Sequence, residues 1–80
     1  MDETLARIVI GNAARATREI GNLAPLLKQH ADPVAYEEIK PGIGEVVYEI
    51  YEAILGPVFA RFPDLKAEFD QNVERYGVGS

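Results

Sequence analysis

The stretch that decides the fold runs from Thr4 to His30 and reads TLARIVIGNAARATREIGNLAPLLKQH. Apolar residues recur in it every three or four positions, which places them on one side of an α-helix. They are Leu5, Val9, Ala13, Ala16, Ile20, Leu23 and Leu27. The alanines at positions 13, 14 and 16 would let a neighbouring helix approach closely. The stretch therefore predicts a long first helix with one apolar stripe.

This first helix contains two features that could interrupt it, the pair Gly21-Asn22 and the single residue Pro25. Gly21-Asn22 could end one helix and cap another, with Pro25 then tolerated in a first turn. Alternatively, the helix runs through and is kinked at Pro25. Because Pro25 projects away from the apolar stripe, the pattern favours a continuous, kinked helix.

A second helix begins at Asp32-Pro33, where Asp32 has the chemistry of an N-cap and Pro33 suits the first helical position. Pro41-Gly42 predicts that this helix is short and ends near Lys40. A third helix begins near Ile43. Its apolar face holds Ile43, Val46, Val47, Ile50, Ile54 and Val58, and Glu45, Glu49 and Glu52 lie opposite.

At Gly56-Pro57 the apolar pattern rotates. A second seam, made of Tyr51, Leu55, Phe59 and Phe62, is displaced by roughly a quarter turn. Pro57 cannot donate a hydrogen bond to the carbonyl of Ala53, which predicts a kink or break there. Phe62-Pro63 predicts a further boundary, after which a last helix runs to Tyr76 with Leu65, Phe69, Val73 and Tyr76 on one stripe. Gly77 suits a C-cap, and residues 77–80 are expected to fray.

These patterns together predict one all-α domain over residues 1–80, a compact bundle of three to four helices. The long first helix is expected to pack antiparallel against the segment from Ile43 to Phe62. The short Pro33 helix and the C-terminal helix would close the bundle. No stretch has the sustained period-two alternation of a β-strand.

The side chains argue against an enzyme. The chain has no cysteine or tryptophan, one histidine (His30) and one serine (Ser80), so an activated nucleophile beside a base is hard to assemble. The lack of an internal serine also excludes an acyl carrier role. His30 and Asp32 lack a second histidine or a cysteine to complete a zinc site. We therefore expect no catalytic residue, no cofactor and no metal.

The net charge of −5 is concentrated in the middle of the chain. Glu45, Glu49 and Glu52 lie along one helical line, which is either a solvated face or a surface for a basic protein partner. The charge and helical character are similar in class to those of small acidic immunity proteins and antitoxins. Arg7, Arg15 and Arg18 form the one candidate nucleic-acid surface, but the patch is small and lacks a recognition motif, which argues against that role.

The seam of Tyr51, Leu55, Phe59 and Phe62 is the candidate interaction surface. It either packs on the last helix through Leu65 and Phe69 or contacts another chain. Eighty residues with neither disulfide nor metal form a marginal core, so self-association, with a dimer favoured, is expected.

The sequence thus predicts a helical interaction or oligomerisation module. An acidic inhibitor of a basic partner is one alternative, and a carrier of a small apolar ligand is another. The longest apolar run, Ile8-Val9-Ile10, is far short of the ~20 residues that cross a bilayer, and the acidic N-terminus does not resemble a signal peptide. We expect a cytoplasmic protein without membrane contact.

Overall fold

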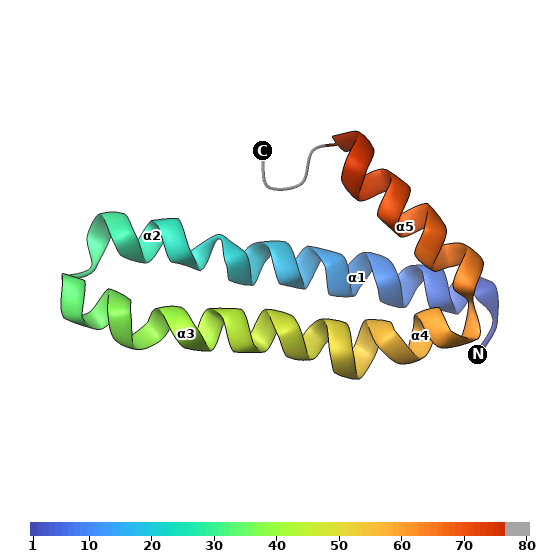
Figure 1. Cartoon of the computed structure of the whole chain (residues 1–80), viewed down its shortest axis with the longest axis horizontal. Helices are drawn as coiled ribbons and strands as arrows, with labels where there is room; N and C mark the ends of the chain where they lie inside the picture. The colour runs from blue at the N-terminus through green and yellow to red at the C-terminus, as the bar shows by residue number, and fades with distance from the viewer. Residues whose placement is uncertain (77–80) are drawn as a thin grey trace.

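The computed structural model describes residues 1–76, and every element in this range is a helix. The elements are α1 (Glu3–Gly21), α2 (Leu23–His30), α3 (Pro33–Glu49), the π-helix η1 (Ile50–Leu55), α4 (Gly56–Arg61) and α5 (Pro63–Tyr76). They form three long arms, α1–α2, α3–η1–α4 and α5 (Figure 1). The first two arms run antiparallel as a hairpin, and α5 folds back from the end of the hairpin at an oblique angle to α1. The predicted all-α class and antiparallel packing are confirmed; Gly77 and residues 77–80 lie outside the described residues.

Two aspartates cap the long arms. Asp32 Oδ1 accepts a hydrogen bond from the backbone N–H of Ala35 at 2.9 Å, and Pro33 occupies the first position of α3. Asp2 Oδ1 does the same for the N–H of Leu5 at 2.8 Å at the start of α1. These carboxylates satisfy amides that have no partner within the helix. The predicted helix start at Asp32-Pro33 is confirmed.

The first arm is interrupted at Asn22, where continuous helix was favoured. Pro25 has no N–H to donate to the carbonyl of Gly21, four residues earlier, and its ring crowds that carbonyl. The proline therefore acts at Gly21-Asn22, where α1 ends and α2 begins, and not at its own position. Asn22 keeps helix-like dihedral angles, φ −68° and ψ −13°, so α1 and α2 lie nearly end to end (Figure 1).

The helix end predicted near Lys40 is wrong, because α3 continues through Pro41 to Glu49. Pro41 removes the donor to the carbonyl of Glu37, but both residues are exposed, so water can take that hydrogen bond. The preceding turn is also held by Lys40, whose Nζ lies 5.5 Å from the centre of the Tyr36 ring. Packing of the following residues against the first arm keeps the segment helical.

The kink predicted at Pro57 takes the form of a π-helix just before it. The N–H of Gly56 donates to the carbonyl of Tyr51, five residues earlier, in place of the usual four. This wider turn inserts one extra residue into the helical repeat. The insertion turns Leu55 and Val58 inward together, so both are buried, while Ile54 is 44% exposed. The π-helix therefore changes which residues of the two predicted apolar seams face inward: Leu55 of the second seam turns inward, and Ile54 of the first seam turns outward.

The buried core is small. Ala6, Val58 and Leu65 form its centre, with Val9, Ile10 and Phe62 packed against them, where α1, α4 and α5 meet. Ala13 and Leu55 are the other buried apolar residues among those described. The predicted stripe is therefore displaced, because Ala6 lies outside it yet is fully buried, and Leu5 and Leu23 within it are largely exposed.

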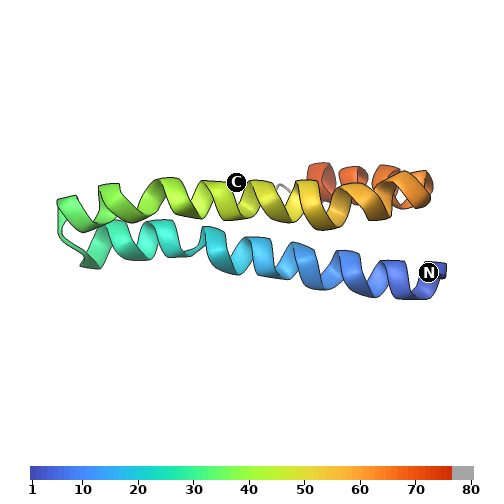
Figure 2. The same ribbon diagram turned by 90° about the horizontal axis from the view of Figure 1, so that it is seen from below.

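The molecule is an elongated bundle of three helical arms, which agrees with the predicted helix bundle but is less compact than predicted. Its extents are 45 × 25 × 15 Å, and along the shortest of these directions the two arms of the hairpin lie one above the other (Figure 2). The radius of gyration of 14.7 Å exceeds the ~11.6 Å expected for a compact domain of this length. An elongated bundle of this kind encloses few of its apolar side chains, and much of the apolar surface stays exposed.

Candidate interaction surfaces

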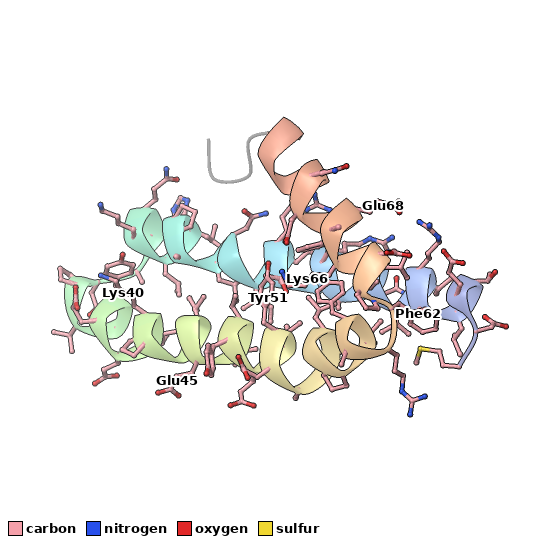
Figure 3. The ribbon with its side chains drawn as sticks, turned by 45° about the vertical axis from the view of Figure 1, so that its right-hand side comes forward. Lys40, Glu45, Tyr51, Phe62, Lys66 and Glu68 are labelled. Carbon is pink, nitrogen blue, oxygen red and sulfur yellow. The ribbon has the colours of Figure 1, made fainter. Side chains whose placement is uncertain are left out.

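The predicted seam lies partly beneath α5. Leu55 is fully buried, Phe59 and Phe62 are half-buried, and Tyr51 is exposed. The Phe69 ring of α5 lies 5.5 Å from the Phe59 ring and 6.4 Å, edge to face, from the Tyr51 ring. Figure 3 shows Tyr51 and Phe62 on the side of the hairpin that α5 covers. Contact of this seam with another chain stays a prediction, and within this chain Phe69 already occupies part of it.

An ion pair fixes α5 to the hairpin beside the aromatic cluster. Arg7 Nη1 donates to Glu68 Oε1 at 2.8 Å, and Arg7 Nη2 donates to Glu3 Oε1 at 3.1 Å. The hydrogen bond from Arg7 lowers the pKa of the Glu68 carboxyl, and the bonds to Glu68 and then Glu3 raise the pKa of Arg7. All three side chains are exposed, so solvent screens the pair and its contribution is modest.

The predicted acidic face is solvent-exposed. Glu45, Glu49 and Glu52 are exposed along the second arm, and none of them takes part in an ion pair among the described residues. Glu45 points away from the first arm (Figure 3). The arrangement is compatible with a solvated face and with a surface for a basic partner.

The predicted basic strip is divided by α5. Arg7 is held by the two carboxylates described above, whereas Arg15 and Arg18 are exposed on α1. His30 is exposed in the last turn of α2, at the negative end of the helix dipole. Asp32 is used as the cap of α3. These residues do not form a cluster suited to phosphate or metal binding.

Helix periodicity places an exposed apolar surface on the side of the hairpin that α5 leaves uncovered. In Figure 2, α5 lies behind the hairpin and no helix crosses in front of it. Side chains that are 42% to 55% exposed mark this surface, which we call the free hairpin face. Its residues are Leu5, Ile8, Leu23, Leu26, Ile39, Val46 and Ile54. Apolar side chains that gather on one face indicate a contact surface.

Sequence reasoning missed the free hairpin face because it assigned four of these residues to the interior. Leu5, Leu23, Val46 and Ile54 belonged to the predicted core stripes, and the structure corrects that assignment. Each arm of the hairpin faces only the other arm, which the small alanines of α1 allow to approach closely. Two apolar stripes that are wider than this contact leave their outer edges unburied. The width of the stripes was the available signal.

Comparisons with protein-family models, with curated proteins and with solved structures gave no match. Among residues 1–76, no helix is both long enough and apolar enough to span a bilayer. Among residues 1–71, whose side chains the structure describes, no three acidic or histidine side chains come together as a candidate metal site.

Proposed function

We propose that this protein is a helical oligomerisation module that acts by presenting helix faces and has no catalytic chemistry of its own. The observation that carries the proposal is the free hairpin face on an elongated bundle with a small core. The bundle buries five apolar residues among those described, which is few for a chain of this length. A second copy on the free hairpin face would give these helices the shared core that stable domains have.

The exposed area supports the same proposal. The chain exposes 5944 Å², whereas a compact monomer of 8.8 kDa exposes about 4,800 Å². The excess is roughly 1,100 Å² per chain. If two copies each buried that area, the interface would total about 2,200 Å², which is in the range of obligate homodimers.

Thermal unfolding at several protein concentrations tests this function. Because association stabilises only the folded state, the melting temperature of an oligomer rises with protein concentration. We expect a steady rise over a hundredfold range. A melting temperature that is the same throughout this range, with a cooperative transition, would contradict the proposal.

Binding of a basic protein partner through Glu45, Glu49 and Glu52 is the second candidate function. It is favoured by the exposure of three carboxylates that have no counter-charge among the described residues. Steep loss of association rate with ionic strength would distinguish such a complex from an apolar one. The two functions use different surfaces, so one chain can have both.

A further inference from the structure

We propose that a second copy of this chain covers the free hairpin face in a two-fold, antiparallel arrangement. In it, the first arm lies on the partner's first arm, and the second arm lies on the partner's second arm. The two hairpins then stack face to face as a bundle of four helical arms, and α5 of each copy lies on the outside. This inference rests on the proposed function and adds the surface, the partner and the orientation.

The residues that contact α5 show which side of each arm faces α5, and helix geometry then shows which residues face the other way. Arg7 contacts Glu68 of α5, and Ile10 packs against the cluster that includes Leu65. Leu5 lies roughly 150° around the helix from both Arg7 and Ile10. On the second arm, Val46 lies about 140° from Tyr51, which contacts Phe69 of α5. Leu5 and Val46 therefore face away from α5.

The exposed residues of the first arm are arranged symmetrically about its middle. Leu5 and Leu26 are equidistant from the peptide bond between Arg15 and Ala16, and so are Ile8 and Leu23. A two-fold axis at this bond brings Leu5 against the partner's Leu26 and Ile8 against the partner's Leu23. In such an isologous contact, each apolar residue meets an apolar residue.

The polar residues of the same strip obey the same symmetry. Asn12 and Glu19 are also equidistant from the Arg15–Ala16 bond, and both are exposed. The axis therefore brings Asn12 beside the partner's Glu19, where the amide can donate a hydrogen bond to the carboxylate. The symmetry produces this pair twice, so both polar residues gain a partner inside an apolar surface.

The second arm has a matching centre. Ile39 lies seven residues before Val46, and Ile54 lies eight residues after it. The same axis therefore brings Ile39 against the partner's Ile54 and Val46 against its own copy. The hairpin turns at Ala31-Asp32, so residues equally far from this turn lie level with one another. By this measure residue 16 lies level with residue 47. The centre of the first arm and the centre of the second arm therefore lie at nearly the same height, so a single two-fold axis can pass through both.

The other two-fold arrangement has its axis along the hairpin and places the first arm on the partner's second arm. Glu19 would then lie nearly level with the partner's Val46. A carboxylate buried against an aliphatic side chain has no hydrogen-bond partner there, which is costly. The antiparallel arrangement is therefore the one that these residues support.

Cross-linking of single cysteines tests the orientation, because the natural chain contains no cysteine. With a short bismaleimide, V46C should give a covalent dimer by itself. I39C and I54C should each give none alone, since each residue lies about 20 Å or more from its own copy. When I39C and I54C are unfolded together, refolded and treated, they should give the mixed dimer.

The outcomes separate this inference from the proposed function. If sedimentation shows a dimer but V46C remains uncross-linked, or I54C cross-links alone, the orientation is wrong and the oligomerisation function stands. If every variant and the natural chain are monomers at all concentrations, both are wrong. Cross-linking in the predicted pattern supports both.

A pair of glutamate substitutions tests the surface itself. Val46 is 45% exposed on the free hairpin face, whereas Tyr48 is 62% exposed about 160° around the same helix. We expect V46E to weaken dimerisation at least tenfold and Y48E to leave it within twofold. Equal effects of the two variants would overturn the assignment of the interface to this face.

Discussion

Arg7 and Glu68 join the first and last helices across 61 positions of sequence, with Arg7 Nη1 donating to Glu68 Oε1 at 2.8 Å. The pair lies at the edge of the cluster formed by Ala6, Val58 and Leu65. The buried cluster joins α5 to one side of the hairpin, and the exposed ion pair adds a modest contribution at the same place. The free hairpin face lies on the other side.

This ion pair predicts a loss of stability in acid. Because the hydrogen bond from Arg7 lowers the pKa of Glu68 below its ordinary value of 4.5, the pair is fully formed above that pH. Its contribution should disappear as the pH falls through the lowered pKa of the folded state. We expect the difference in denaturation midpoint between the natural chain and E68Q to shrink between pH 7 and pH 3. A difference that does not change with pH would contradict this assignment.

The contact between Phe59 and Phe69 should appear as a measurable coupling. Their rings lie 5.5 Å apart, and aromatic pairs of this kind contribute about 0.5–1.5 kcal/mol beyond area burial. A double-mutant cycle with F59A and F69A, measured by chemical denaturation, should give a coupling energy of that size. The cycle of F69A with Y48A, whose ring is largely exposed, serves as the control and should be additive.

The same cycle bears on the aromatic seam predicted from sequence. If F59A weakened association while the free energy of unfolding of the monomer were unchanged, Phe59 would contact another chain. We expect the reverse, because Phe69 of the same chain already meets it.

Two glycines should respond differently to alanine. A Cβ at Gly44 would have no neighbour within 4 Å, so G44A should gain about 1 kcal/mol from higher helix propensity. A Cβ at Gly56 would lie 3.3 Å from the carbonyl oxygen of Tyr51, the acceptor that the π-helix uses. We therefore expect G56A to gain less or to destabilise the fold. Equal gains in thermal unfolding would show that the π-helix does not constrain Gly56.

A substitution on the acidic face should change the stability of the fold very little. Glu49 is exposed and has no ion-pair partner among the described residues, so E49Q should change the free energy of unfolding by less than about 0.5 kcal/mol. Chemical denaturation of E49Q beside the natural chain measures this. A larger loss would show that the carboxylate is paired in solution.

Local chemistry made much of this fold predictable. The cap at Asp32, the boundary at Phe62-Pro63 and the helical character of each segment follow from nearby residues, and they occur as predicted. The prolines were harder to interpret, because the effect of a proline depends on the carbonyl four residues earlier. At Pro25 that carbonyl marks a break, at Pro41 it is solvated, and at Pro57 a π-helix accommodates it.

The surfaces were less predictable than the helices. The exposure of Glu45, Glu49 and Glu52 follows from their position opposite an apolar stripe. The exposure of Val46 and Ile54 depends on how far each arm turns toward its neighbour, and for Ile54 on the extra residue of the π-helix. Periodicity gives the direction of a stripe but not the width that a neighbour covers.

Sedimentation equilibrium of the natural chain at several micromolar concentrations measures whether the free hairpin face joins two copies. We expect the mass to rise with concentration to a plateau at twice the 8.8 kDa of one chain, and V46E to lower the mass at a given concentration whereas Y48E does not. A mass of one chain at every concentration up to several hundred micromolar, with the helices still folded by circular dichroism, would contradict it.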